Sequence, residues 1–326
     1  MKRCAATSST ANAARRAAAR AKVALVLAVC GLSLAPAPVA THTARARQDD
    51  EVITVESDLV VLNVTATDVG GAYVRGLRKP DFKVFEDGRE QEVTNFGEEE
   101  TPFAVALLLD TSGSMENRIT FARSAAIRFL DGLRPDDAAA VYSFNTKIER
   151  VQDYSNSRDL SPKAFELGAE GYTVLNDAIF RAAQDLSKRP EKRRAILVLS
   201  DGADTRSSAS ADKALNAALA SNATIYTVDM GQGPGGSPIT SGAAGSAAGA
   251  LRNFAGKSGG RYVATPGGQA LREAFAEIVE ELSNQYTLGY RPSNRARDGR
   301  WRAIEVKVAR PSVTARTRRG YKLAKP

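Results

Sequence analysis

The side chains best suited to chemistry in this sequence follow a run of apolar residues. Residues 104–109 are apolar throughout, and Asp110, Ser112 and Ser114 come directly after them. A short apolar run that ends in a turn signal is typical of a strand buried on both faces of a parallel sheet. One carboxylate and two hydroxyls on alternate residues can converge on one point, and they suit a hard cation such as Mg²⁺. We therefore expect a cation site at the carboxyl end of this strand, the edge where ligands bind in open α/β sheets.

Two later stretches carry polar groups of the same kind. Residues 171–178 read Gly-Tyr-Thr-Val-Leu-Asn-Asp-Ala and include Thr173, and residues 195–202 are a second apolar run that ends in Ser-Asp-Gly, with Asp201. Asp-x-Ser-x-Ser followed by these stretches in this order resembles the metal-ion-dependent adhesion site of the von Willebrand factor A (VWA) family. The stretches lie about 60 and about 30 residues apart, which suits separate strand ends of one sheet. The alternative is three ordinary polar loops.

The resemblance implies what these residues do. Ser112, Ser114 and Thr173 would contact a Mg²⁺ or Mn²⁺ ion, and Asp110 and Asp201 would bind it directly or through water. Because only two of these five oxygen groups carry a formal charge, the ion would keep residual positive charge and an open coordination position. An Asp or Glu side chain of a protein partner would fill that position. The predicted function is metal-dependent recognition of a partner carboxylate by an adhesion-type module of the cell envelope.

The sequence favours a binding module over an enzyme. Both cysteines, Cys4 and Cys30, and the single histidine, His42, lie within the first 47 residues. The rest of the chain therefore has no disulfide, no Cys or His nucleophile, no imidazole base and no soft-metal site. We predict no catalytic residues and no organic cofactor. Two alternatives are a Mg²⁺-dependent hydrolase with Asp201 as base, and a structural envelope protein whose metal only stabilises loops. A phosphatase of the haloacid dehalogenase type would need an aspartate where Ser112 stands.

The first residues have the composition of a secretory leader. A basic start, an apolar core from Val23 to about Ala35 and a small-residue stretch through Ala40 predict a signal peptide over residues 1–40, cleaved between positions 40 and 47. The apolar core is shorter than the ~20 residues that a membrane span needs. We therefore expect a secreted or periplasmic protein with no transmembrane segment in the mature chain. An uncleaved anchor is the alternative.

Three segments follow the leader. Residues 101–284 alternate apolar strands with amphipathic helices, which implies a doubly wound, mainly parallel α/β sheet, the Rossmann-like fold of VWA domains. Residues 51–100 predict an N-terminal β module with a hairpin turn at Asp87-Gly88, and alternation in residues 285–326 predicts antiparallel strands. We expect these two terminal segments to pair into one β-sandwich-like module. The resemblance extends over nearly the whole mature chain, to the VWA-related proteins found abundantly in Acidobacteria.

Charge is distributed unevenly along the chain. Residues 1–47 hold eight basic residues and no acidic one, which accounts for the whole net charge of +8, so the rest of the chain is neutral. The pI near 9.5 therefore does not predict nucleic-acid binding. Residues 285–326 carry twelve basic residues against Asp298 and Glu305, a net +10, with aromatic residues interleaved. One interpretation is binding to an anionic polymer or membrane surface, and the favoured one is a solvated strand face that complements an acidic body.

Other polar segments have structural explanations. Asp136 and Asp137 are interpreted as a turn before a strand rather than as a metal pair. Residues 231–249 are rich in Gly, Ser and Ala, which predicts a flexible loop. We expect Asp204 and Thr205 to shape the rim of the cation site.

Overall fold

The structure is a computed structural model that describes residues 59–97, 101–231, 244–265 and 267–323. The predicted signal peptide, residues 1–40, lies outside the described residues. Every helix in the described part of the chain is too short or too polar to span a membrane.

A six-stranded sheet forms the centre of the fold, in the order β10-β9-β8-β5-β6-β7. All neighbours are parallel except β6 and β7. The chain continues from β5 to β6 on one side and later places β8 on the other, so the strand order reverses beside β5, where open α/β sheets bind ligands. The strands are β5 (Phe103–Asp110), β6 (Ala138–Phe144), β7 (Ile148–Ser155), β8 (Arg193–Ser200), β9 (Ala223–Asp229) and β10 (Tyr262–Ala264).

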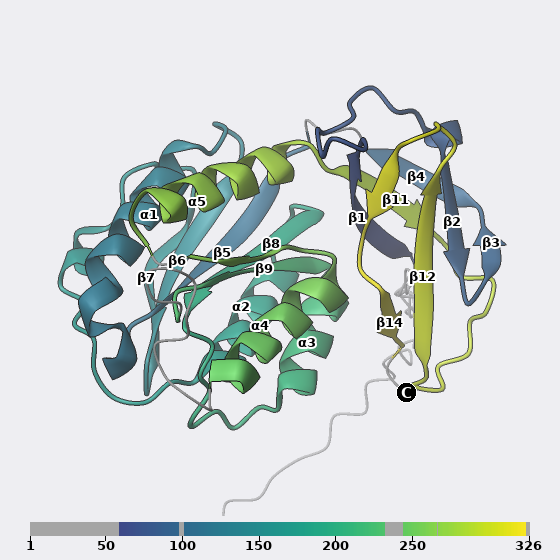
Figure 1. Cartoon of the computed structure of the whole chain (residues 1–326). Coiled ribbons are helices and arrows are strands. Elements are labelled where there is room, and N and C mark those ends of the chain that lie inside the picture. Colours follow the sequence, from purple (N-terminus) through teal and green to yellow (C-terminus); the bar gives the residue numbers. More distant parts are fainter. Residues whose placement is uncertain (1–58, 98–100, 232–243, 266, 324–326) are drawn as a thin grey trace, which may run out of the picture. The chain divides into compact units, whose positions relative to one another are not determined.

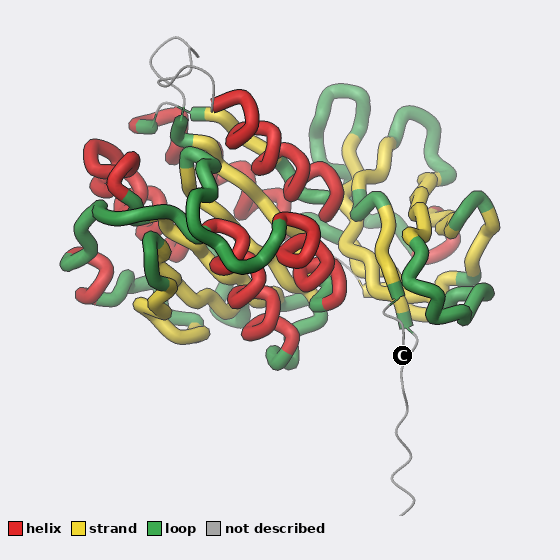
Figure 2. The backbone as a smooth tube through the Cα atoms, turned by 90° about the horizontal axis from the view of Figure 1, so that it is seen from below, coloured by secondary structure: helices red, strands yellow, loops and turns green. Residues whose placement is uncertain are grey.

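Helices cover both faces of this sheet, as Figure 1 shows and as Figure 2 shows from a second direction, with strands in yellow between helices in red. Side chains of β5 alternate between the two faces. Leu107 packs in one buried cluster with α1 and α5, and Leu108 packs in a second with α2, α3 and α4. The predicted doubly wound fold is therefore confirmed. The helices are α1 (Ile119–Asp131), α2 (Leu175–Ser187), α3 (Ala211–Ala220), α4 (Ala244–Ser258) and α5 (Gly268–Ser283).

One prediction in this region is wrong. Residues 244–249, expected to belong to a flexible loop, form the first turns of α4. Alanine is the strongest helix former, and α4 packs against β9, so the segment gains tertiary support that its composition does not reveal. The rest of the predicted loop, residues 232–243, lies outside the described residues.

The strands from the two ends of the chain form two antiparallel sheets, in the orders β13-β1-β11-β4 and β14-β12-β2-β3. Each sheet combines N-terminal with C-terminal strands, and the two share one apolar core that includes Leu62, Val84, Leu288 and Val306. This is the β-sandwich-like module that the alternating patterns predict. Its strands are β1 (Val60–Thr67), β2 (Phe82–Glu86), β3 (Arg89–Gln91), β4 (Val93–Gly97), β11 (Tyr286–Tyr290), β12 (Trp301–Val308), β13 (Thr314–Arg316) and β14 (Gly320–Lys322).

Part of the basic C-terminal segment is buried. Arg302 is 2% exposed and donates to Glu86 Oε1 at 3.2 Å. Arg318 is 7% exposed and donates to the carbonyl of Leu219 at 2.9 Å. Lys307 is exposed on β12, as a solvated strand face requires. The solvated-face interpretation is therefore wrong for the two buried arginines, which instead bind groups far away in the sequence.

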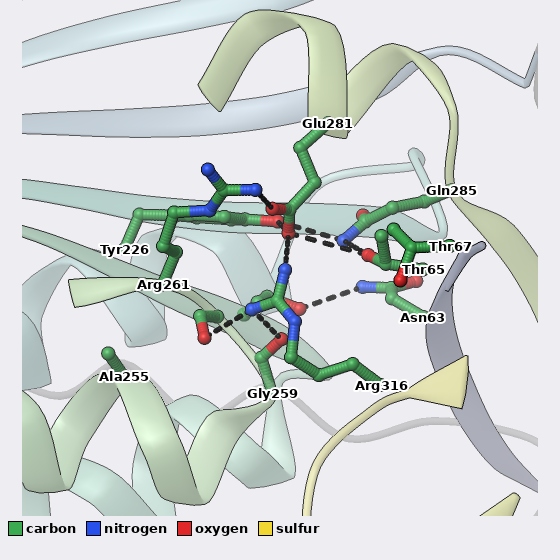
Figure 3. A network of polar contacts seen from close by, with 12 residues as sticks. Asn63, Thr65, Thr67, Tyr226, Ala255, Gly259, Arg261, Glu281, Gln285 and Arg316 are labelled. Atoms are coloured by element: carbon green, nitrogen blue, oxygen red, sulfur yellow. Dashed lines mark hydrogen bonds and ion pairs between the residues drawn. The ribbon is translucent and has the colours of Figure 1, made fainter. Parts of the chain in front are cut away.

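A second buried carboxylate ties together strands and helices that are remote in sequence (Figure 3). Glu281, near the end of α5, is fully buried, and Arg316 of β13 lies 2.5 Å from its Oε1. The Tyr226 hydroxyl of β9 donates to the same oxygen at 2.8 Å, and the Thr65 hydroxyl of β1 donates to it at 3.4 Å. Arg261 lies 3.3 Å from Oε2. This network fixes β1 and β13 against α5 and β9.

Candidate metal centre

Asp110 is the last residue of β5, and its side chain is completely buried. Its Oδ1 accepts a hydrogen bond from the backbone N–H of Ser112 at 2.9 Å. Its Oδ2 accepts one from the hydroxyl of Ser200 at 2.5 Å, and that hydroxyl also accepts from the N–H of Gly202 at 3.0 Å. The carboxylate is therefore held by groups from two neighbouring strand ends.

Ser200 was not singled out from the sequence. A signal was present, because Ser200 ends an apolar run directly before Asp201. The pairing of Leu109 with Leu199 places Ser200 beside Asp110. That neighbour relation depends on which strands pair, which a single sequence leaves open.

The two predicted serine ligands lie together after β5. The hydroxyl oxygens of Ser112 and Ser114 are 3.1 Å apart. Ser112 is 2% exposed, whereas Ser114 is exposed, so the pair leads from the buried carboxylate to the surface. Met115, in the 3₁₀ turn Gly113–Arg118, is fully buried in the apolar core and anchors this loop from below.

The loop that carries Thr173 is hydrogen-bonded to the loop after β5 and to the loop after β8. The N–H of Gly113 donates to the carbonyl of Gly171 at 3.3 Å. The carbonyl of Thr173 accepts from the N–H groups of Thr205 and Arg206 at 3.0 and 3.1 Å, and the Thr205 hydroxyl accepts from the Thr173 N–H at 3.0 Å. The Thr173 side chain is 3% exposed, and the described residues offer its hydroxyl no hydrogen-bond partner. The three loops thus meet at one edge of the sheet, with Thr205 at its rim.

Asp201 adds a second carboxylate at this edge. It is partly exposed, and its Oδ1 accepts from the N–H of Ala203 at 3.2 Å. Burial raises the pKa of Asp110 to about 6, hydrogen bonds from Ser112 and Ser200 lower it, and the negative charge of Asp201 raises it further. The charge of Asp201 therefore repels the buried Asp110 carboxylate, and a bound cation would offset this repulsion.

Neighbouring acidic residues are used by the loops themselves. The Asp204 carboxylate accepts from the N–H of Asn176 at 2.8 Å and the hydroxyl of Ser207 at 2.7 Å. The Asp177 carboxylate accepts from the N–H groups of Ser208 and Ala209 at 2.8 and 2.7 Å. These carboxylates fix the rim of the site, because their oxygens already bind backbone and hydroxyl groups.

Asp136 and Asp137 lie at the other end of the sheet. The Asp137 carboxylate accepts from the N–H groups of Phe103 and Arg134, at 3.1 and 2.9 Å, beside the start of β5. The interpretation of this pair as a turn before a strand is confirmed.

The predicted ligands fit a hard cation in their chemistry. They offer only oxygen atoms, two carboxylates and three hydroxyls. Two of the loops follow the parallel strands β5 and β8, whereas the loop with Thr173 does not follow a strand end as expected, because it lies directly before α2. The described residues contain no group of three or more His, Cys, Asp or Glu side chains that could hold a metal. A cation here would therefore depend on the hydroxyl groups, and the site would bind more weakly than an all-carboxylate one.

Gly202 is required next to Asp201. Its φ is +81°, and a Cβ would lie 2.7 Å from the carbonyl oxygen of Ala247 in α4. We expect Gly202→Ala to lower the free energy of unfolding by about 2 kcal/mol through strain and overpacking, measured by urea denaturation. The matched control is Gly249→Ala inside α4, where a Cβ meets nothing within 4 Å. That variant is expected to be more stable by about 0.5–1 kcal/mol, and equal effects of the two variants would contradict the argument.

Comparisons with known proteins agree with this architecture. Residues 105–203 match the family model described as von Willebrand factor type A domain. The resemblance of this part of the chain to the VWA family is therefore confirmed. A search of curated protein sequences found no match.

Among the solved structures that match this chain are the following three. An aerotolerance-related membrane protein from Bacteroides fragilis is 19% identical, with a TM-score of 0.44 over 55% of this chain and 98% of that one. The conserved hypothetical protein BatB from Bacteroides thetaiotaomicron is 17% identical, with a TM-score of 0.45 over 56% and 98%. A von Willebrand factor type A protein from Catenulispora acidiphila is 13% identical, with a TM-score of 0.48 over 75% and 74%.

Proposed function

We propose that this chain, in which residues 105–203 are a VWA domain, binds a protein partner through a divalent cation at the carboxyl ends of β5 and β8. VWA domains mediate protein interactions. The observation that carries the proposal is the fully buried Asp110 carboxylate, whose pKa burial raises to about 6 and which lies within electrostatic reach of Asp201. The proposed ligands of a Mg²⁺ or Mn²⁺ ion are Asp110, Ser112, Ser114, Thr173 and Asp201.

The hydroxyl-rich ligand set determines what the site would recognise. Three neutral hydroxyls and two carboxylates would hold a divalent ion without surrounding it by excess negative charge. When bound, the ion would offer an electrophilic position to an Asp or Glu side chain of the partner. Ser114 is exposed, so that position would face the solvent. The residues of the site hold and orient the ion, and none is assigned a catalytic role.

The surface near the site supports a protein partner. Tyr172, next to Thr173, is 52% exposed, and the guanidinium of Arg206 lies 4.3 Å from the centre of its ring. Phe121, in the first turn of α1, is 42% exposed. Exposed aromatic residues and arginine are enriched at protein interfaces, where they bury large areas with little loss of conformational entropy.

The proposed location is outside the cytoplasm, in the periplasm or secreted. It rests on the basic, apolar and small-residue order of residues 1–40, the features of a signal peptide.

Calorimetric titration of the purified chain with Mg²⁺ and Mn²⁺ tests the proposal. We expect binding of one ion per chain, and we expect Ser112→Ala or Thr173→Ala to weaken it by about tenfold or more, since each removes a proposed ligand. Asp136→Ala, an exposed carboxylate at the other end of the sheet, should leave the affinity unchanged. Absence of binding to the wild-type chain would refute the proposal. If a metal binds, capture of a protein partner is compared in Mg²⁺ and in chelator. Capture that requires Mg²⁺ indicates a binding module, and metal binding without capture indicates a structural role. Turnover of a substrate would indicate a hydrolase.

A further inference from the structure

A cleft of about 400 Å³ lies next to the candidate metal centre. Two residues belong to both places. Thr111, between Asp110 and Ser112, lines the cleft, and so does Gly171, whose carbonyl accepts from the loop after β5. The other lining residues come from β6, β7 and the turn between them, and from residues 166–168 and 170. A partner side chain bound at the cation would therefore lie beside the mouth of this cleft.

The lining of the cleft is acidic. Glu149, Glu166 and Glu170 contribute three carboxylates, and Lys147 contributes the one ammonium group. All four side chains are exposed, and none forms an ion pair within the described residues. The three carboxylates do not converge on one point, because the described residues contain no acidic group of three able to hold a metal ion. An extended organic cation suits separated carboxylates better than a small ion does.

A hydroxyl without a hydrogen-bond partner among the described residues, on a residue that is otherwise buried, is a second feature of the cleft. Ser143, the residue before the end of β6, lines the cleft and is only 4% exposed. The part of the chain that the structure describes gives its hydroxyl no hydrogen-bond partner. The hydroxyl itself is not buried, so it is open to the cleft and is free to bind a ligand or water there. The neighbouring Thr111 hydroxyl, in contrast, already donates to the carbonyl of Phe144 at 3.2 Å.

We propose that this cleft binds a basic side chain, Lys or Arg, of the same partner whose Asp or Glu binds the cation. The proposal rests on the proposed function for the identity of the partner. The ammonium or guanidinium group would donate to the glutamates, and a guanidinium, with five N–H donors, can reach several acceptors at once. Partners that place an acidic residue without a basic neighbour would meet only the repulsion of the glutamates. The cleft thus makes the site selective among acidic ligands.

The cleft is tested first with agmatine, a free guanidinium compound, by two-dimensional NMR of the whole chain in the presence of a chelator. We expect saturable shifts of the amide signals of Ser143 and Gly168. The triple variant Glu149→Gln, Glu166→Gln, Glu170→Gln should bind agmatine about tenfold more weakly with an unchanged pattern of other signals. Lys147→Ala should bind it about twofold to threefold more tightly, because the competing ammonium is removed. Absence of shifts in the wild-type chain, or equal binding by the triple variant, would overturn the proposal.

The second test links the cleft to the cation. Heptapeptides with a central Asp and with Arg, Ser or Glu at one flanking position are titrated into the whole chain. Each titration is done once with Mg²⁺ and once with chelator. We expect the best Arg peptide to bind about tenfold more tightly than its Ser counterpart, the Glu peptide to bind most weakly, and these differences to vanish in the triple variant. Equal Mg²⁺-dependent binding of all three would overturn the proposal. If no peptide requires Mg²⁺, the proposed function fails, and the agmatine titration alone decides whether the cleft binds a basic group.

Discussion

Asp110→Asn is expected to stabilise the metal-free protein at neutral pH and to abolish its stabilisation by Mg²⁺. The Asp110 side chain is completely buried, and burial raises its pKa to about 6. At pH 7.5 the carboxylate is ionised beside Asp201, so its charge destabilises the folded state. Asparagine has the same shape, and its oxygen can accept from the N–H of Ser112. The pKa change from 3.8 to about 6 corresponds to a gain on the order of 3 kcal/mol at most.

The pH dependence of this difference has a defined sign. Because the pKa of Asp110 is higher in the folded than in the unfolded chain, this group binds more protons in the folded state between about pH 4 and about pH 6, and its contribution to stability falls as pH rises through this window. The advantage of Asp110→Asn over the wild type should therefore be near zero below about pH 4 and complete above about pH 6. Urea denaturation in chelator at a series of pH values measures it. An advantage that does not change with pH would contradict the argument.

The same group controls the response to metal. A cation at 100 times its dissociation constant stabilises the wild type by about 2.7 kcal/mol, and the effect should weaken below about pH 6 as Asp110 becomes protonated. Asp110→Asn should show no effect of Mg²⁺ on the midpoint of unfolding. Asp136→Asn, which alters an exposed carboxylate far from the site, should behave like the wild type. A Mg²⁺ effect that survives in Asp110→Asn would place the ion elsewhere.

The central sheet was predictable because its strands are buried on both faces. All eight residues of β5 are buried, and the seven before Asp110 appear in the sequence as an unbroken apolar run. The edge strand β7 gave no such signal, since Val151 is its one buried residue and its pairing with β6 has two register irregularities. Edge strands are defined by the neighbour that they pair with, and a single sequence does not contain that information directly.

The candidate site was predictable only in part, for a related reason. Asp110 and Asp201 each follow an apolar strand, so their place at the sheet edge follows from the sequence pattern. The hydrogen bond of Ser200 to Asp110 and the place of Ser143 in the lining of the cleft depend on which strands are neighbours. Such contacts join residues far apart in the chain, and no local pattern encodes them.

The number of basic residues in the C-terminal segment did not predict which of them are buried. Arg302 occupies the same face of β12 as Ile304 and Val306, so the alternation alone places it inward. Counting it as a solvated charge overlooked its partner Glu86, which is 216 residues away in sequence. A buried ion pair of this kind can be recognised only when both strands are placed, because an isolated arginine facing the core is strongly unfavourable.

Glu281→Ala is expected to destabilise the protein by about 3 kcal/mol, the lower end of the range for breaking a buried ion pair. The carboxylate is fully buried, and its removal leaves Arg316 and Arg261 without their shared anion. The estimate stays at the lower end because these two side chains keep 37% and 35% of their surface exposed and can be solvated in part. Urea denaturation measures the loss. Glu280→Ala, at an exposed position one residue earlier, is the matched control and should change stability by less than about 0.5 kcal/mol.

A double-mutant cycle separates the network from simple loss of packing. Arg316 donates to the carbonyl of Gly259 at 3.1 Å as well as contacting Glu281, so Arg316→Ala should be destabilising alone. If the two side chains act together, the double variant should lose less than the sum of the single losses, by about 1 kcal/mol or more. Additive losses would mean that Glu281 stabilises α5 without coupling it to β13. Coupling would establish that the buried Glu281 carboxylate helps to hold β13 to α5.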